Sequence, residues 1–252
     1  MESVSSGELS VVVPVYEEGA AILPVLEGIF ACVPADSRVF AVFDAPSDST
    51  VPYLEEYARR ESRLRPVLNT YGRGAAFAVR SGLDHADTDV VVVTMGDGSD
   101  DPHQIVEMAD KVRAGAAVAA ASRYVAGGGL VGGPLAKRTL SRLAGLTLHR
   151  FAGLPIHDAT SAYKAYSVEF IRSISIQSTG GFEITLELVA KAHRLRLPMV
   201  EIPTVWRDRT EGVSHFRLLQ WLPQYLHWYW FTFGRPLTAA QLEARTTKRS
   251  RT

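Results

Sequence analysis

Three aspartates stand close together directly after one of the most apolar runs of the chain. Asp97, Asp100 and Asp101 lie in TMGDGSDDP (94–102), which follows TDVVVV. Like charges at such short spacing repel one another unless a positive charge lies among them. Carboxylate oxygens are the ligands that Mg²⁺ and Mn²⁺ prefer. The stretch therefore indicates a divalent cation site, with a solvated turn as the alternative.

Polar side chains also follow four other apolar runs that read as buried strands. The five runs alternate with segments of helical periodicity, and this predicts an α/β fold with a mostly parallel, doubly wound, Rossmann-like sheet. The carboxyl ends of parallel strands should share one edge, where ligands bind. The groups behind the other four runs are Pro14, Tyr16, Glu17 and Glu18, then Asp44 and Asp48, then Gly72-Arg73-Gly74, and finally Ser122 and Arg123.

Together these groups suit a nucleotide diphosphate. Mg²⁺ usually binds to protein through one or two carboxylates while it holds substrate phosphates. Arg73 lies between two glycines and suits a phosphate or a base edge. Asp44 can accept from a base or from ribose hydroxyls, and Tyr16 can stack on a base. The chain has no lysine-bearing phosphate loop of the G-x-x-x-x-G-K-[ST] type.

Seven segments, in order, resemble those of family-2 glycosyltransferases, and among these most resemble the dolichyl- or polyprenyl-phosphate glycosyltransferases. The resemblance covers about residues 8 to 216. The segments are VVVPVYEEGAAI, VFDAPSDST, YGRGAAFAVRSG, VVVTMGDGSDDP, AASRYVAGGG, LPIHDATSAYKAY and VEIPTVWRDRTEGVSHF. The resemblance implies an A-type glycosyltransferase fold, a nucleotide-sugar donor, a divalent cation (Mg²⁺ or Mn²⁺) and inversion at the sugar.

The resemblance also implies roles for single residues on the donor side. Those expected to contact the nucleotide are Pro14, Tyr16, Glu18, Asp44 and Arg73. The chain departs from the usual D-x-D metal motif, because an ungapped alignment places Gly96 and Gly98 at the two aspartate positions. Either the loop is shifted so that Asp97 is the principal ligand, followed by Asp100, or metal binding is weakened. Asp101 is expected to cap the helix that starts near Pro102.

The acceptor side depends on the group that attacks the sugar. An alcohol needs a general base, whereas a phosphate monoester is already ionised and needs positive charge to position it. The resemblance associates Arg123 and Arg209 with an acceptor phosphate, and we add Ser214 and His215 as acceptor-binding candidates. Asp158 and Glu183 are candidate bases for an alcohol. For Asp158, the alternatives are orienting its loop and holding an arginine. The catalytic candidates are Asp97, Asp158, Arg123 and Arg209.

The chain divides into a catalytic domain at 8–215, an aromatic helix at 216–235 and a basic tail at 236–252, which is expected to be flexible. Within the domain, about 8–125 should bind the nucleotide sugar and about 126–215 the acceptor. On the aromatic helix, Arg217, Gln220, Gln224 and His227 form a narrow polar stripe opposite a wide apolar face. That face either packs on the domain or on a partner chain in a homodimer, or it lies in a membrane interface.

Composition narrows the class of partner and the location. The 27 Lys and Arg balance the 27 Asp and Glu, so no overall field favours nucleic acid. A single cysteine and an amino terminus without signal-peptide character favour a cytoplasmic enzyme, peripheral on the cytoplasmic membrane face. We predict an inverting, metal-dependent transfer of a hexose from a UDP- or GDP-sugar to a polyprenyl or dolichyl phosphate. The alternatives are a soluble or protein acceptor, and a non-catalytic protein that binds nucleotide sugar or lipid.

Overall fold

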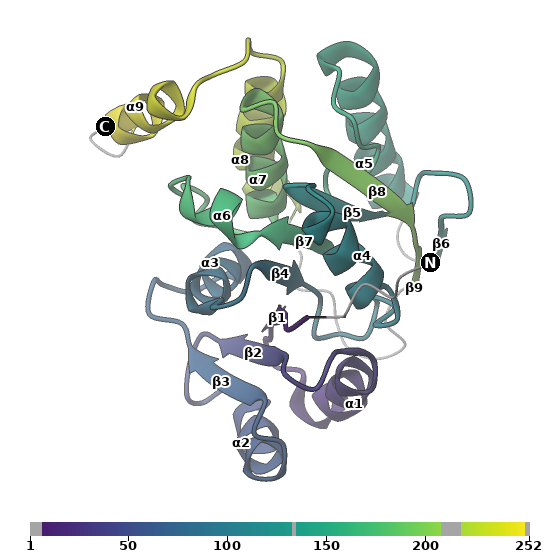
Figure 1. Cartoon of the computed structure of the whole chain (residues 1–252), viewed down its shortest axis with the longest axis vertical. Helices are drawn as coiled ribbons and strands as arrows, with labels where there is room; N and C mark the ends of the chain where they lie inside the picture. The colour runs from purple at the N-terminus through teal and green to yellow at the C-terminus, as the bar shows by residue number, and fades with distance from the viewer. Residues whose placement is uncertain (1–6, 133–134, 208–217, 250–252) are drawn as a thin grey trace.

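The computed structural model describes residues 7–132, 135–207 and 218–249 (Figure 1). The strands are β1 (Ser10–Pro14), β2 (Arg38–Phe43), β3 (Leu64–Leu68), β4 (Val90–Val93), β5 (Val118–Ser122), β6 (Gly129–Val131), β7 (Lys164–Ser167), β8 (Met199–Pro203) and β9 (Val205–Arg207). The helices are α1 (Ile22–Cys32), α2 (Val51–Arg60), α3 (Ala75–His85), α4 (Gln104–Arg113), α5 (Leu135–Thr147), α6 (Val168–Arg172), α7 (Glu183–Arg194), α8 (Leu218–Thr232) and α9 (Ala239–Arg249). Two short turns complete them, the 3₁₀ turn η1 (Gly19–Ala21) and the π-helical turn η2 (Leu148–Ala152).

A seven-stranded sheet with the order β3-β2-β1-β4-β7-β5-β8 forms the centre of the molecule. All neighbouring strands are parallel except β7, which runs antiparallel to both β4 and β5. The five strands predicted from apolar runs are therefore present as parallel neighbours or near neighbours. Because β7 is antiparallel to β4 and β5, the loop that precedes β7 lies at the edge where those two strands end.

Alternate residues of each strand supply the two faces of the sheet. Val12, Val42 and Val91 lie in one apolar cluster with residues of α3, α6, α7 and α8. Val11 and Val13 lie in a second cluster with residues of α1, α2 and α4. A sheet that is buried on both faces explains the continuous apolar runs, since no strand position has to face water.

The two predicted halves of the catalytic domain share this one sheet. Strands β7 and β8 come from the part after residue 126, yet β7 lies between β4 and β5. The glycine-rich segment that follows β5 contains β6, which pairs in parallel with β9. The acceptor half is therefore built into the nucleotide half, and their loops meet at a common edge.

The carboxyl-terminal segments differ in part from expectation. Helix α8 packs along α7, and its Trp228 is 3% exposed, so much of the predicted apolar face packs on the domain. Part of the segment expected to be a flexible tail forms α9 instead. Thr238 and Gln241 cap this helix by exchanging backbone-to-side-chain hydrogen bonds, and Leu242 is buried. Among the residues that the structure describes, none of the helices is long and apolar enough to cross a bilayer.

Candidate active site

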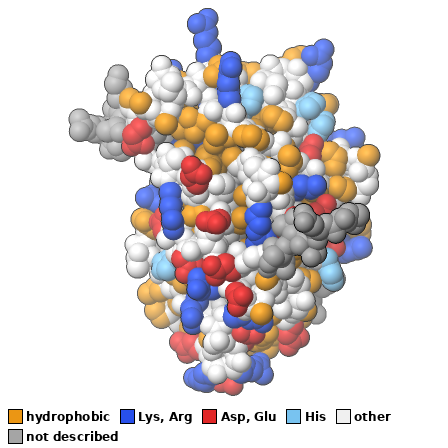
Figure 2. All heavy atoms as spheres, viewed as in Figure 1, with side chains coloured by type: hydrophobic (Ala, Val, Ile, Leu, Met, Phe, Trp, Pro, Cys, Tyr) orange, Lys and Arg blue, Asp and Glu red, His pale blue; other side chains and the backbone are white. Residues whose placement is uncertain are grey.

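Loops that follow the parallel strands meet at the carboxyl edge of the sheet, as predicted. On the face drawn in Figure 2, acidic side chains gather near the middle of the molecule and apolar side chains gather above them. The geometry of each loop shows how the chain places the residues predicted to do chemistry.

The loop after β1 is tied to the loop after β2. The Asp48 carboxylate accepts from the backbone N–H of Glu17 (3.0 Å) and of Thr50 (2.8 Å). The Thr50 hydroxyl accepts from the N–H of Glu18 at 3.0 Å. These bonds hold Glu17 at a φ of 56°, a conformation that non-glycine residues rarely adopt. Pro14 is buried at the end of β1, whereas Tyr16 is 53% exposed beside the loop.

Asp44 organises the loop that carries Arg73. Its carboxylate accepts from the Asn69 side-chain amide at 2.8 Å and from the Gly74 N–H at 2.7 Å. Gly74 has a φ of 128°, and a Cβ there would lie 2.5 Å from the Gly180 carbonyl oxygen. Only glycine fits this close approach, and it places the exposed Arg73 at the tip of the loop.

The aspartate loop folds into a turn in which its carboxylates have different surroundings. Asp97 accepts from the Ser99 N–H at 3.1 Å, and Asp101 accepts from the His103 N–H at 3.0 Å just before α4. The half-buried Asp100 accepts from the Met95 N–H (3.0 Å) and from the Thr94 hydroxyl (3.1 Å). A Cβ at position 96 would lie 3.1–3.3 Å from Val15, Pro14 and Ile22. This tight packing explains the glycine at the first D-x-D position.

The carboxylates of this loop fit a divalent cation that is shared with a substrate. Burial, followed by the nearby charge of Asp97, raises the pKa of Asp100 to about 7 against the lowering effect of its hydrogen bonds. A cation between the two would remove both penalties. Within the described residues, no cluster of three or more His, Cys, Asp or Glu side chains could hold a metal alone. The arrangement suits a metal that takes its remaining ligands from phosphate oxygens.

Arg123 and Asp158 form a buried ion pair at the end of β5. The guanidinium donates through Nε (2.7 Å) and Nη2 (2.8 Å) to the two oxygens of Asp158, which is 0% exposed. Burial raises the pKa of Asp158, but the charge and hydrogen bonds of Arg123 outweigh burial and hold this pKa below its ordinary value. Asp158 is thus placed to hold an arginine, one of the alternatives that the sequence left open. The same Arg123 also lowers the pKa of Asp100, so the pair lies within electrostatic reach of the aspartate loop.

The hydroxyls around Arg123 connect it to α5. Its Nη2 donates to the Ser141 hydroxyl at 3.2 Å, and Ser141 lies 2.6 Å from the hydroxyl of Thr160. A Cβ at Gly145 would lie 1.9 Å from the His157 carbonyl oxygen, so α5 lies directly against the loop that supplies Asp158. The inner side of α5 is therefore part of the site.

The remaining predicted residues either hold a loop in place or lie outside the residues that the structure describes. Glu183, a candidate base, is fully buried and accepts from the N–H groups of Gly180 (2.9 Å) and Gly181 (2.6 Å). The described chain reaches the aspartate loop at Arg207, whose N–H donates to the Ser99 carbonyl at 3.3 Å. Arg209, Ser214 and His215 follow it and lie outside the described residues.

One buried cationic residue lies outside the set predicted from sequence, and this is Lys164, which is fully buried in β7. Its ammonium donates to the carbonyls of Ser161 and Ala159, and so it holds the loop that carries Asp158. Burial lowers its pKa to about 8, and the charge of Asp158 opposes that shift. The sequence did not indicate that this lysine is buried, because a lysine at the same position of an edge strand would be exposed to solvent.

Lys164 predicts a pH-dependent contribution to stability. Its pKa is 10.5 when unperturbed and about 8 in the fold, so between these values the unfolded chain holds the proton and the folded chain does not. The free energy of unfolding of the parent relative to Lys164→Met should therefore rise by about 2 kcal/mol between pH 8 and 9.5. Urea denaturation of both proteins at the two pH values measures it. A difference that is independent of pH would contradict the lowered pKa of Lys164.

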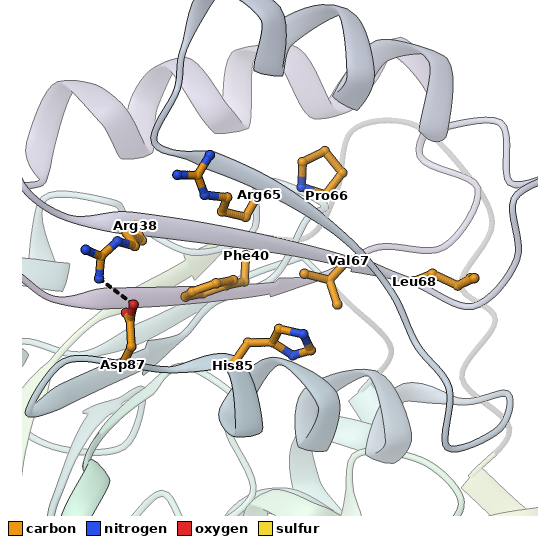
Figure 3. A pocket seen from close by; sticks show the side chains of 8 residues that line it. All are labelled: Arg38, Phe40, Arg65, Pro66, Val67, Leu68, His85 and Asp87. Carbon is orange, nitrogen blue, oxygen red and sulfur yellow. Dashed lines mark ion pairs between the residues drawn. The ribbon is translucent and has the colours of Figure 1, made fainter.

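An open hollow elsewhere on the surface is not part of this site. Figure 3 shows it between β2, β3 and the end of α3, with Arg38 paired to Asp87 at 2.5 Å. Arg38 begins β2 and His85 ends α3, so the hollow reaches the amino-terminal end of the strands. The predicted residues do not line it.

Curated relatives resemble the chain over most of its length. A polyprenol monophosphomannose synthase of Mycolicibacterium smegmatis is 29% identical, with 81% of this chain and 79% of the relative covered. An undecaprenyl-phosphate mannosyltransferase of Micrococcus luteus is 28% identical (81% and 85% covered). The dolichol-phosphate mannosyltransferase of Saccharomyces cerevisiae is 27% identical (90% and 89% covered).

Solved structures confirm the predicted fold. Glucosyl-3-phosphoglycerate synthase of Mycobacterium tuberculosis, in complex with Mn²⁺, UDP-glucose and phosphoglyceric acid, superposes with a TM-score of 0.68 at 18% identity. The match covers 92% of this chain and 82% of that enzyme. The chain therefore has the mostly parallel α/β architecture of A-type glycosyltransferases. Residues 10–175 match the family described as Glycosyl transferase family 2, and with the loops above this shows that the chain is a glycosyltransferase that belongs to that family.

Proposed function

We propose that the chain transfers a hexose from a UDP- or GDP-sugar to a polyprenyl or dolichyl phosphate, with inversion at the sugar. One observation carries the choice of acceptor. Both described carboxylates considered as bases, Asp158 and Glu183, are fully buried and already accept hydrogen bonds from other groups. A phosphate acceptor needs no base, and the nearby Arg123 supplies the charge that such an acceptor needs. The names of the three curated relatives support the same acceptor class.

On the donor side, the nucleotide would lie over the ends of β1, β2 and β3. Tyr16 would stack on the base beside Pro14 and Glu18, and Asp44 would accept from the base or ribose. Arg73, at the tip of its glycine loop, would reach a phosphate. The support is that Asp48, Thr50 and Asp44 hold these loops to one another by hydrogen bonds.

Asp97 and Asp100 would hold Mg²⁺ or Mn²⁺, with the donor diphosphate supplying further oxygens. The ion would neutralise charge that develops on the departing nucleotide. Arg123 would face the acceptor phosphate, held at its back by Asp158. Arg209, Ser214 and His215 would contribute from the segment that follows Arg207.

The reaction would take place at the cytoplasmic membrane face, with the enzyme attached peripherally. The exposed apolar residues of α8, Leu226 and Trp230, support contact with lipid or with a second copy. A homodimer through this helix is the competing arrangement.

A donor and acceptor screen tests the proposal. Radiolabelled UDP- and GDP-hexoses are incubated with a short polyprenyl phosphate, the matching polyprenol, or phosphoglyceric acid, with Mn²⁺ or with chelator. We expect label in the lipid phosphate only, and only with the metal. Label in the free alcohol or in the soluble acid would refute the lipid-phosphate acceptor.

Asp44→Ala should weaken nucleotide binding. The variant loses the charged acceptor proposed for the nucleotide and also the bond that holds Gly74. A charge-assisted hydrogen bond of this kind contributes about 1.5–3 kcal/mol, so we expect the Kd for UDP or GDP to rise by about 10- to 150-fold. Calorimetric titration of parent and variant measures the change. An unchanged Kd for both nucleotides would place the pocket elsewhere.

A further inference from the structure

Helix α5 and the turn η2 expose a row of large apolar side chains. Soluble proteins rarely leave such a group in water, and a large exposed patch marks a contact surface. The exposed fractions are 74% for Leu135, 44% for Leu140, 52% for Leu143, 53% for Leu146 and 71% for Phe151.

The four leucines lie on the outer side of α5, and Phe151 follows them in η2. Leu140, Leu143 and Leu146 follow at intervals of three, which at about 100° per residue keeps them within about 120° of the helix circumference. The inner side holds Ser141, next to Arg123, and Gly145, packed on the carbonyl of His157. The helix is thus held by the acceptor site on one side and presents leucines on the other.

The charge of this part of the chain has one sign. Residues 135–157 include Lys137, Arg138, Arg142 and Arg150 but no aspartate or glutamate. Arg142 and Arg150 are exposed beside the leucines. A segment that combines exposed apolar side chains with cations and has no carboxylate of its own is complementary to anionic lipid headgroups. A second copy of the same surface would bring like charges together.

The aromatic helix α8, for which the sequence left membrane contact open beside packing on the domain or on a partner chain, contributes less. It buries Trp228 against α7 and leaves Leu226 and Trp230 exposed. The Tyr229 hydroxyl donates to the Thr147 hydroxyl at 2.9 Å, so α8 lies against the end of α5. The ring of Trp230 lies edge to face against the Tyr229 ring, at a centroid distance of 5.3 Å, so this exposed side chain lies next to the residue that contacts α5.

We propose that α5 and η2, with Trp230 at their border, form the surface that docks the protein on an anionic bilayer. The inference rests on the proposed lipid acceptor. Docking would place Ser141, and with it Arg123, just beneath the headgroup layer, so that a lipid phosphate reaches the guanidinium without leaving the membrane. Such a surface would lower the concentration of long-chain acceptor that the enzyme needs.

Vesicle flotation tests the proposal on the full chain. The double variant Leu143→Ser/Leu146→Ser is compared with the parent on vesicles of phosphatidylglycerol and phosphatidylcholine, and on phosphatidylcholine alone. Leu68→Ser is the matched control, because Leu68 is 43% exposed on the distant strand β3. We expect the parent to float with the anionic vesicles only. The double variant should bind them about tenfold or more weakly, while the control matches the parent.

Activity assays separate this inference from the proposed function. Transfer to a short, water-soluble polyprenyl phosphate should match the parent in the double variant, whereas transfer to a long-chain acceptor in vesicles should fall about tenfold. A parent that never floats would overturn the docking surface. So would a parent that is dimeric by light scattering and becomes monomeric in the double variant. Vesicle binding that behaves as expected, without transfer to any lipid phosphate, would instead refute the proposed acceptor while docking stands.

Discussion

Asp97→Asn should lower hexose transfer by about 100-fold or more, equal to a loss of about 2.7 kcal/mol of transition-state stabilisation. The substitution removes the charge that would hold the cation against the donor diphosphate. It keeps an oxygen that can accept from the Ser99 N–H, so the turn and the fold should persist. Initial rates at saturating donor, with Mn²⁺ varied, measure the effect, and excess Mn²⁺ should restore part of the activity.

The same loop provides a matched control. Asp101→Asn removes a carboxylate four residues away that binds His103 at the start of α4. If charge near the metal is what matters, this variant should keep its rate within about threefold of the parent, because exposed charges are well screened. Full activity of Asp97→Asn in the presence of chelator would rule out the metal role.

Separating Arg123 from Asp158 should affect both stability and acceptor use. Removing one partner of a buried ion pair leaves an uncompensated charge and costs about 3–5 kcal/mol. Asp158→Ala should therefore lose about that much stability and nearly all transfer. Arg123→Lys keeps the charge but cannot bind both carboxylate oxygens. We expect this variant to raise the KM for the lipid phosphate about tenfold or more, with little change in nucleotide affinity.

A double variant distinguishes structure from catalysis at this pair. Arg123→Met/Asp158→Leu replaces the pair by apolar side chains, which often restores stability. We expect its unfolding midpoint to return toward that of the parent while transfer stays absent, because no cation then faces the acceptor. Urea denaturation and rate assays on the three variants measure this. Transfer by the double variant at the parent rate would limit the pair to a structural role.

Much of the fold and of the donor side follows from local sequence. Runs such as Val90–Val93 are β-branched and apolar because both faces of the sheet are covered, and a strand of this kind is readable from its residues alone. The position of Asp44 and of Asp97 after such runs follows as well, since parallel strands present their carboxyl ends at one edge.

Other features depended on contacts between segments far apart in the chain. Lys164 became a buried ammonium only because β7 lies between β4 and β5 in the antiparallel direction, and sequence spacing does not determine which gap a strand enters. Asp158 stopped being a plausible base because Arg123, 35 residues earlier, takes both of its oxygens. Helix periodicity in the residues of α5 and α8 gives each helix an apolar face. It could not show which apolar face would find a partner, because that depends on the room left by the rest of the fold. Gly181 leaves space for Trp221 of α8 beside α7, whereas the leucines of α5 have no such surface opposite them in the described part of the chain.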